Sequence, residues 1–419
     1  MSKSRYLSAS EAANELGVTL ATLYSYVSRG LIQSEASEDG KRKRRYNRQD
    51  VQRLRDRKDQ RRDPAKAAEG ALRWGAPVLP SALTLIADGK LYYRGYDALE
   101  LAANNTFEQV AALLWTRDLQ ADLDNLFSRT RVIDADQYQR LYYQPVRDSA
   151  QLEAFQVALS LAAAEDPVAY DFRPGPVAQT GALVLWLLTL VAARCDKPAD
   201  WRDGSGIAQL LQHSWTLTHP QAAMLLNTAL ILCADHELNV SSFTARCVAS
   251  AGSTPYAAVT AGLAALQGTK HGGHTQRVEA LFHEVGTPDN AGRVIASRLK
   301  RGEAVPGFGH RLYPEGDPRG RQILYLLEEV LPDAQPVALA KAICAEVFQL
   351  IGEYPTLDLG LVVLAQALNL NPGYAMSLFA LGRTVGWIAH AGEQYQLNQL
   401  IRPRARYIGP LPSDLPGVN

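Results

Sequence analysis

The sequence has few cysteines and no long uninterrupted hydrophobic run. Its four cysteines, Cys195, Cys233, Cys247 and Cys344, include no C-x-x-C pair. This argues against a disulfide framework and a zinc ribbon, and favours a reducing cytoplasm. The longest nearly apolar run, Gly181–Ala193, is shorter than the roughly 20 residues that span a bilayer. The start of the chain has no apolar segment either, so we expect no secretory signal and no membrane association.

Net charge is also absent, but the zero balance hides an asymmetry. The chain has 43 basic and 43 acidic residues, yet its first 62 residues hold 15 of the basic and only 8 of the acidic ones. Residues 41–62 alone hold 12 Lys and Arg. This concentration predicts a polyanionic partner for the N-terminal segment, with nucleic acid the first candidate. The remainder is net acidic, and 47% of all residues are hydrophobic, which indicates a globular protein of two or three domains.

Two short helices are predicted near the start of the chain. Ser8 and Glu11 form a capping-box pattern, which places a helix start at Ser8, and Gly17 ends that helix. Thr19 caps a second helix that we expect to end at Gly30. Two short helices joined by a tight turn predict a helix-turn-helix, whose second helix can enter the major groove of DNA.

A basic hairpin and a third helix follow in the sequence. The run Lys41–Arg45 comes directly after a turn signal, which is typical of a wing that grips phosphates. A helix from Asn47 to about Arg62 would direct Val51 and Leu54 inward. We list as candidate DNA-binding residues Thr19, Thr22, Arg29, Arg42, Arg44 and Arg45.

This order of elements resembles the MerR/excisionase type of winged helix-turn-helix domain, and the resemblance covers residues 1–62. It implies binding to DNA. A small helical appendage that provides solubility or subunit contacts is the alternative. Residues 63–78 are predicted to form a linker, since Pro64 ends the preceding helix.

The remaining sequence is predicted to be mostly α-helical. Apolar residues recur at helical spacing, and Pro, Gly and Asp separate the segments. One short strand-like stretch lies at residues 90–93. The predicted helices cover residues 106–117, 149–165, 180–194, 207–219, 220–235 and 336–351.

Several polar residues in this part of the chain lie in unusual sequence contexts. His271 and His310 lie next to glycines, which suit close approach of a ligand, and Asp358 and Arg383 follow them. Histidines, a carboxylate and arginines together fit acid/base chemistry on a small polyanionic substrate, because arginine binds carboxylates and histidine polarises carbonyl oxygens. No metal-ligand spacing, nucleophile elbow, P-loop or dinucleotide motif occurs. Of the other histidines, His236 and His390 lie in unusual sequence contexts, and His274 follows the two glycines after His271. The remaining ones, His213, His219 and His283, lie in ordinary helical contexts.

From about Leu79 to Gly409 the sequence resembles citrate synthase. The blocks that carry the resemblance follow in the family's order: 81–86, 89–97, 235–246, 270–273, 306–313, 317–319 and 378–394. The resemblance implies an all-helical fold with a large domain, residues 79–258 and 359–419, and a small domain, residues 259–358, that closes over the substrates. It also implies a homodimer and condensation of oxaloacetate with acetyl-CoA.

The resemblance implies a role for each candidate residue. Asp358 would remove a proton from the methyl group of acetyl-CoA, and His271 would stabilise the resulting enolate. His310 would polarise the ketone of oxaloacetate. The expected oxaloacetate ligands are His236, Arg319, Arg383 and Arg402, the last one reaching the site from the other subunit. Gly307 and Gly309 are weaker candidates for CoA binding. We expect no metal and no other cofactor, with acetyl-CoA as a substrate.

Two departures from the family pattern leave alternatives open. His274 and Thr275 replace the usual Ala-Asn after the His-Gly-Gly motif, and Leu359–Val362 replaces Phe-Tyr-Ser-Gly after the aspartate. A 2-methylcitrate synthase, which uses propionyl-CoA, shares the same blocks. A transcription regulator whose enzyme-like body senses oxaloacetate, citrate or an acyl-CoA is the alternative of a different class.

Overall fold

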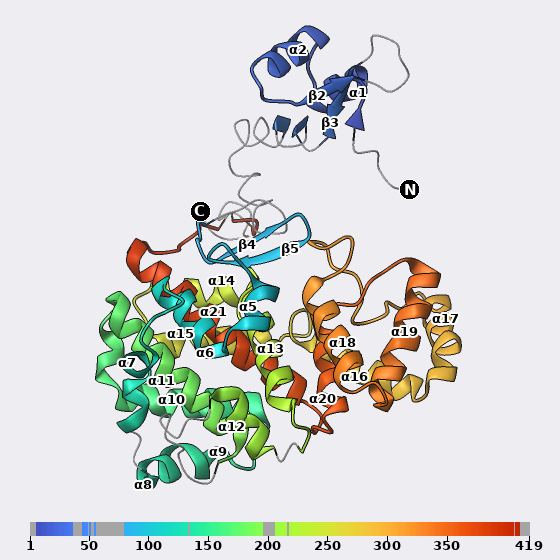
Figure 1. The fold of residues 1–419 in the computed structure, drawn as a ribbon. Coiled ribbons are helices and arrows are strands. Elements are labelled where there is room, and N and C mark those ends of the chain that lie inside the picture. Colours follow the sequence, from blue (N-terminus) through green and yellow to red (C-terminus); the bar gives the residue numbers. More distant parts are fainter. Residues whose placement is uncertain are drawn as a thin grey trace. The chain divides into compact units, whose positions relative to one another are not determined.

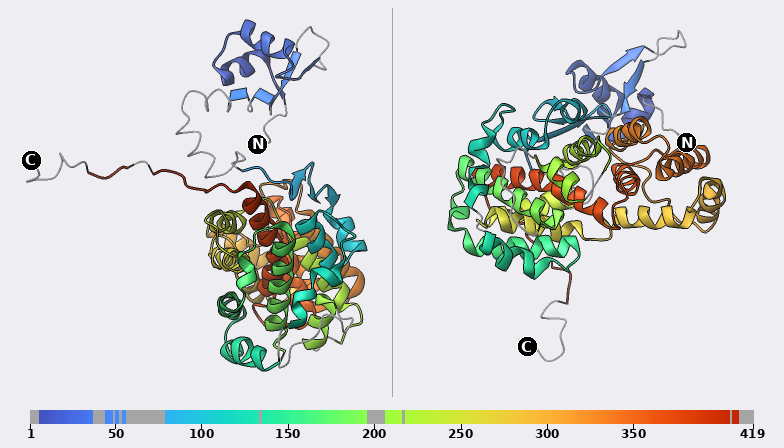
Figure 2. Two further views of the ribbon diagram at one scale, coloured as in Figure 1. Left: turned by 90° about the vertical axis from the view of Figure 1, so that its left-hand side faces the viewer. Right: turned by 60° about the horizontal axis from the view of Figure 1, so that its bottom comes forward.

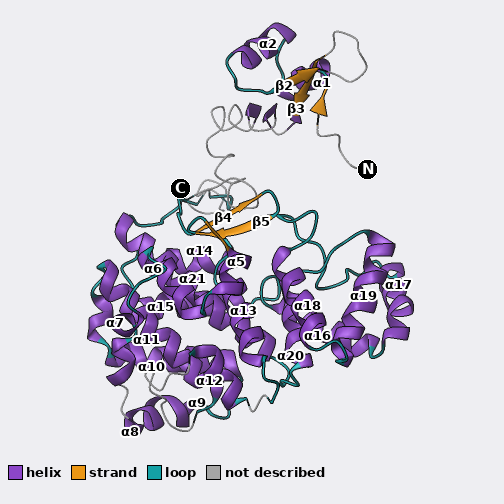
Figure 3. Ribbon diagram, viewed as in Figure 1, coloured by secondary structure: helices purple, strands orange, loops and turns teal. Residues whose placement is uncertain are grey.

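The chain forms two compact units, Met1–Pro80 and Ser81–Asn419, here called the N-terminal unit and the helical unit (Figure 1). The computed structural model describes residues 6–36, 44–48, 50–51, 54–55, 79–132, 135–195, 206–215, 218–405 and 407–410. Figure 3 marks helices, strands and loops in these ranges.

The N-terminal unit is a helix-turn-helix with a small antiparallel sheet. Its elements are β1 (Tyr6–Leu7), α1 (Ala9–Leu16), α2 (Leu20–Ser28), β2 (Ser34–Ala36) and β3 (Arg44–Asn47), and the strand order is β1-β3-β2. Its own small core consists of Leu7, Ala12, Ala13, Leu16, Leu23, Ile32, Tyr46 and Val51, all buried.

The local signals in this segment are confirmed. The capping box of Ser8 and Glu11 is formed, Gly17 is the C-cap of α1, and the side chain of Thr19 caps α2. The second helix ends at Ser28 rather than at the predicted Gly30. Arg42 and residues 56–78, which include the predicted linker, lie outside the described residues.

The helical unit begins with a three-stranded sheet, β4 (Thr84–Ala87), β5 (Lys90–Tyr93) and β6 (Tyr96–Asp97), in the order β4-β5-β6. Helical elements follow it: α5 (Ala98–Asn104), α6 (Phe107–Thr116), α7 (Leu123–Leu126), η1 (Ser128–Val132), α8 (Ala135–Gln137), η2 (Tyr138–Tyr143), α9 (Gln144–Val146), α10 (Gln151–Glu165), η3 (Pro167–Tyr170), α11 (Pro174–Ala193), α12 (Ile207–Ser214), α13 (Ala222–Cys233), α14 (Val240–Ser250), α15 (Pro255–Leu266), α16 (Gly273–Val285), η5 (Pro288–Asn290), α17 (Ala291–Lys300), α18 (Pro318–Val330), α19 (Gln335–Ile351), α20 (Leu357–Ala367) and α21 (Tyr374–Leu397).

Helix α21 is the centre of the larger group of helices. It contacts α6, α11, α13, α14, α15 and α20, and its residues from Ala375 to Ala391 are buried without interruption. Helix α11 starts at Pro174, six residues before the predicted start. It is long and apolar enough to cross a membrane, but 83% of its apolar window is buried in the unit. This burial is that of a core helix in a packed protein.

Helices α16 to α19 form a second group, which Figure 1 and the right-hand view of Figure 2 place beside the larger one. Helix α17 packs on α19, and α18 and α16 pack on α20. The predicted boundaries after residues 258 and 358 fall inside α15 and α20. Helix α15 packs on α10, α14 and α21, so its second half lies with the larger group. The division into a large and a closing domain stays a prediction.

Candidate active site

The first component of the site is a buried arginine–aspartate pair at the start of α18. Asp317 is the N-cap of this helix, and its carboxylate accepts from Arg319 Nε at 2.9 Å and from Arg319 Nη2 at 2.8 Å. Burial alone would lower the pKa of Arg319, but the adjacent carboxylate outweighs it and the pKa is raised. Burial opposes ionisation of Asp317 as well, yet the arginine keeps its pKa below the ordinary value. Both groups are therefore charged at neutral pH.

Three aromatic rings lie beside Arg319. His236 Nε2 lies 3.1 Å from the hydroxyl of Tyr313, and the ring centroids of His236 and His310 are 5.3 Å apart. The Arg319 guanidinium lies over the Tyr313 ring at 5.6 Å. Burial, with the arginine charge second, lowers the pKa of both histidines. Both rings are thus neutral at pH 7 and can donate a hydrogen bond to a carbonyl oxygen.

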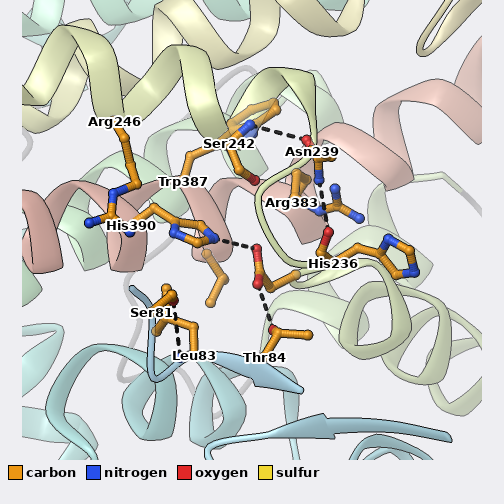
Figure 4. Close-up of polar contacts among 12 residues, drawn as sticks. Ser81, Leu83, Thr84, His236, Asn239, Ser242, Arg246, Arg383, Trp387 and His390 are labelled. Carbon is orange, nitrogen blue, oxygen red and sulfur yellow. Dashed lines mark hydrogen bonds and ion pairs between the residues drawn. The ribbon is translucent and has the colours of Figure 1, made fainter. Parts of the chain in front are cut away.

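Arg383 provides a second buried cation for the same region. It lies on α21, is 1% exposed and donates from Nε to the Cys233 carbonyl at 2.7 Å. Its guanidinium also lies 4.8 Å from the centroid of the Phe379 ring. In Figure 4, Arg383 lies close to His236 and Asn239. Its charge and that of Arg319 both lower the pKa of His236. Two arginines near one imidazole suit a ligand with more than one carboxylate.

His271 is held by a hydrogen-bond network around Ser241. His271 Nε2 lies 2.9 Å from Ser241 Oγ, and Trp387 Nε1 donates to the same oxygen at 3.1 Å. The hydroxyl of Ser241 donates to Asn239 Oδ1 at 2.8 Å. Asn239 Oδ1 also accepts from the backbone N–H groups of Ser241 and Ser242. Ser241 is therefore held in place, and its contact with Nε2 fixes the orientation of the His271 ring.

Burial lowers the pKa of His271 to about 4. The ring is therefore a neutral hydrogen-bond donor at physiological pH. A neutral donor stabilises a developing enolate without first giving up its proton.

Asp358 lies in the first turn of α20, where close helix packing fixes its backbone. An added Cβ on Gly320 of α18 would lie 2.3 Å from the Thr356 carbonyl oxygen, so only glycine permits this contact. Gly307, with φ of 87°, accepts a hydrogen bond from Thr356 N at 2.9 Å, and Gly309 N donates to the Tyr354 carbonyl at 3.0 Å. These contacts join the loop that carries His310 to the segment that leads into Asp358.

The carboxylate of Asp358 accepts a hydrogen bond from Thr275 Oγ1 at 3.0 Å. Burial raises the pKa of Asp358, while the Thr275 hydrogen bond and the charge of His274 lower it. The net shift is upward. A carboxylate with a raised pKa is a stronger base than an ordinary aspartate, as proton abstraction from carbon requires.

A buried contact between His390 and Asp235 supports the site, and neither residue was assigned a role from the sequence. His390 Nε2 lies 3.2 Å from Asp235 Oδ1, both side chains are fully buried, and Thr84 Oγ1 donates to Asp235 Oδ2 at 2.6 Å. Figure 4 shows His390 and Thr84 on opposite sides of this carboxylate. Since Asp235 directly precedes His236, the pair fixes the backbone that presents the imidazole.

The structure brings most of the candidate residues together and leaves one apart. His236, His310, Arg319 and Arg383 form one cluster by contacts or charge, and Arg319 also acts on Asp358. His271 joins through the charge of Arg383. Arg402 lies in the extended segment after α21 and is exposed. Within the ranges that the structure describes, it makes no hydrogen bond to the others.

Other features were only partly visible in the sequence. Tyr313, Asp317 and Ser241 occur in the motif blocks, but their roles emerge only from the contacts. Gly307 and Gly309 have packing roles here, and their contribution to CoA binding stays a prediction. No cluster of three or more His, Cys, Asp or Glu that could hold a metal occurs in the described ranges.

The N-terminal unit presents the remaining candidates. Thr19 and Thr22 contact each other through their hydroxyls at 3.0 Å, and Arg29 and Arg44 are exposed. Arg45 pairs with Glu35 at 2.8 Å and lies over the Tyr6 ring, which gives it a role in stabilising the sheet. Among the described DNA-binding candidates, Arg29 and Arg44 are thus more exposed than Arg45.

Comparison with known proteins agrees with this geometry. Residues 71–404 match the family model described as citrate synthase, C-terminal domain. The chain belongs to the citrate synthase family. Residues 7–61 match the MerR helix-turn-helix regulatory family model, in agreement with the N-terminal unit.

Curated relatives of this citrate synthase family member carry two names. This chain is 31% identical over 352 residues to citrate synthase 2 of Bacillus subtilis, and the alignment covers 80% of this chain and 95% of the relative. This chain is 33% identical over 343 residues to 2-methylcitrate synthase of Mycobacterium tuberculosis, and the alignment covers 78% of this chain and 87% of the relative. The solved citrate synthase of Thermotoga maritima superposes on this chain with a TM-score of 0.69 at 27% identity. The superposition covers 80% of this chain and 95% of the solved one. The helical unit therefore has the citrate synthase fold, and the family reaction is a condensation of the citrate or 2-methylcitrate type.

Proposed function

We propose that the protein condenses oxaloacetate with acetyl-CoA and hydrolyses the product to citrate and CoA. The observation that carries this proposal is the position of the base Asp358 near the two buried arginines Arg319 and Arg383. Asp317 links the base to Arg319, because it binds this arginine and also accepts from Leu357 N at 3.1 Å. A dicarboxylate held at the arginines would therefore lie near the base.

The proposed reaction uses only proton transfers and hydrogen bonds from the chain, with acyl-CoA as a substrate and no cofactor. Asp358 removes a proton from the methyl group of acetyl-CoA, and the N–H of His271 stabilises the enolate oxygen. The enolate carbon attacks the ketone carbon of oxaloacetate, whose oxygen His310 polarises and protonates. Water then attacks the thioester of citryl-CoA, and CoA leaves.

Substrate binding is assigned to the residues that surround this centre. Arg319 and Arg383 would hold the oxaloacetate carboxylates, and His236 would donate to one of its oxygens. In the proposed homodimer, Arg402 of one subunit would reach the site of the other, which is consistent with its exposure in the single chain. A cytoplasmic location is proposed on the basis of its four cysteines, which are all free.

The choice between acetyl-CoA and propionyl-CoA separates the citrate synthase from its 2-methylcitrate alternative. Release of the CoA thiol is measured with oxaloacetate and each acyl-CoA in turn, and mass spectrometry identifies the product. We expect citrate and a higher kcat/KM with acetyl-CoA. A higher value with propionyl-CoA assigns the protein as a 2-methylcitrate synthase, and no turnover with either contradicts the enzymatic proposal.

We also propose a second function for the N-terminal unit, namely binding to double-stranded DNA. It is supported by the MerR match, by the capped helix α2 and by exposed Arg29 and Arg44. Phosphate contacts predict that the binding constant falls steeply with salt, by about 0.9 logarithmic units per contact and tenfold change of salt. Arg29→Ala and Arg44→Ala should each lower affinity and reduce this slope. Salt-independent binding, or none, favours the alternative in which the unit is a subunit-contact arm.

A further inference from the structure

Thr275 is a buried residue whose side chain contacts the proposed base directly. It lies in the first turn of α16, is 1% exposed, and its hydroxyl donates to Asp358 Oδ1 at 3.0 Å. Helix α16 packs on α20, which carries Asp358. The hydrogen bond therefore spans two packed helices and restricts the rotation of the carboxylate.

His274 precedes Thr275 and is exposed. Its charge lowers the pKa of Asp358 and, less strongly than burial and Arg383, that of His271. His274 thus lies within electrostatic range of the proposed base and of the proposed enolate-stabilising histidine. Both residues replace the Ala-Asn of the family pattern. Neither an alanine nor an asparagine supplies a titratable group, so the imidazole of His274 is a departure from that pattern.

We propose that Thr275 and His274 are positioning residues for the catalytic base. Thr275 holds Oδ1 of Asp358 so that Oδ2 takes the proton from the acyl-CoA, and His274, which precedes Thr275 in the first turn of α16, favours the carboxylate form when its imidazole is protonated. This inference rests on the proposed condensation. It concerns how the base is held and tuned, rather than which reaction occurs.

Other charged groups face the same carboxylate and contribute to its ionisation. From α18, Arg319 lowers the pKa of Asp358 and Asp317 raises it. Burial lowers the pKa of His274, Asp358 opposes this shift, and Arg277 from α16 adds to it, so the net shift is downward. These groups stay in place in variants at positions 274 and 275. A change in the pH profile of such variants therefore reports on the removed hydroxyl or imidazole.

The test compares the pH dependence of kcat in wild type, Thr275→Val, Thr275→Ser and His274→Ala. Valine has the shape of threonine without the hydroxyl, so the hydrogen bond that lowers the pKa of Asp358 is lost and the pKa rises. The acidic limb of the kcat profile should move upward by about one pH unit, which is a tenfold loss of kcat on that side. Thr275→Ser keeps the hydroxyl and should restore the wild-type profile. His274→Ala should move the limb in the same direction by less, and all variants should keep the oxaloacetate KM within about twofold.

The outcomes separate this inference from the proposed function. Wild-type protein without turnover refutes the condensation itself. Active wild type with an unchanged pH profile in Thr275→Val refutes the role of Thr275, and an unchanged profile in His274→Ala refutes that of His274. If Thr275→Val does not fold, Thr275→Ala removes the same hydroxyl with a smaller side chain, and an unmoved acidic limb in that variant is equally contradictory.

Discussion

Asp317 binds Arg319 through two hydrogen bonds of 2.9 and 2.8 Å. The same carboxylate accepts from the backbone N–H of Leu357, the residue before Asp358. One buried anion thus aligns the arginine proposed for oxaloacetate and the start of the helix that carries the base. Substrate binding and proton abstraction therefore share a structural support, and changes at this pair should affect both.

Arg319→Ala should raise the oxaloacetate KM by about 100-fold or more, because a buried charged hydrogen-bond donor is worth several kcal/mol to a carboxylate ligand. It should also destabilise the fold, since Asp317 is left buried without its main partner. Steady-state kinetics and thermal unfolding measure the two effects. Arg321→Ala, two residues further along α18, is the matched control and should change KM little. An unchanged KM in Arg319→Ala would refute the assignment.

Ser241→Ala should lower kcat by roughly 10- to 100-fold, with a smaller effect on the oxaloacetate KM. The change removes the hydroxyl that orients His271, so the imidazole loses its fixed orientation. His271→Ala removes the donor itself and should cost more, about 100- to 1,000-fold. Kinetics of both variants and of the double variant test the order. If the two losses multiplied in the double variant, Ser241 would not act through His271.

Asp358→Asn should stabilise the folded protein at neutral pH. Burial raises the pKa of Asp358 above its ordinary value. The group therefore stabilises the folded state most at pH values below the ordinary pKa of an aspartate. This stabilisation is lost as the pH rises through the pKa of the folded state. Asparagine carries no charge, so the variant does not lose this stability as the pH rises. Melting temperatures near pH 7.5 should rise by a few degrees, at roughly 2–4 °C per kcal/mol, and the gain should vanish near pH 4. A gain of equal size at both pH values would contradict this explanation.

His390→Phe should lower the free energy of unfolding by about 3–5 kcal/mol, because it leaves the carboxylate of Asp235 buried without the imidazole nitrogen that lies 3.2 Å from it. Chemical denaturation measures the change. His213→Phe is the control, since His213 is an exposed histidine on another helix of the same unit. Equal stability of the two variants would show that the Asp235–His390 pair is not a support of the site.

The sequence predicted the features that depend on local physics. The caps at Ser8 and Thr19 and the apolar spacing of α6, α10 and α19 follow from neighbouring residues alone, and the structure agrees with them to within two residues. Helix α12 is shorter than predicted, Ile207–Ser214, since apolar spacing does not define where a helix ends. The start of α11 was placed too late because its first turn is less apolar than the rest.

The sequence motifs predicted the candidate site residues but not the residues that contact them. His271 and His310 stand in recognisable motif blocks, and Asp358 lies between two of these blocks, but the partners of His271 and Asp358 lie far away in the chain. Ser241 is 30 residues from His271, and Thr275 is 83 residues from Asp358. Such pairings depend on how helices cross, for example at Gly320, and no local pattern encodes them.

The most direct test of the account is CoA thiol release from acetyl-CoA and oxaloacetate by wild type and by Asp358→Asn, with oxaloacetate binding measured on both. Asparagine keeps the size of the side chain and can still accept from Thr275, but it cannot take a proton. We predict turnover by wild type, a loss of about 100- to 10,000-fold in the variant, and similar oxaloacetate affinity. Equal turnover by the two proteins would contradict the assignment of Asp358 as the base. No turnover by folded wild type that binds oxaloacetate would contradict the enzyme and favour the regulator.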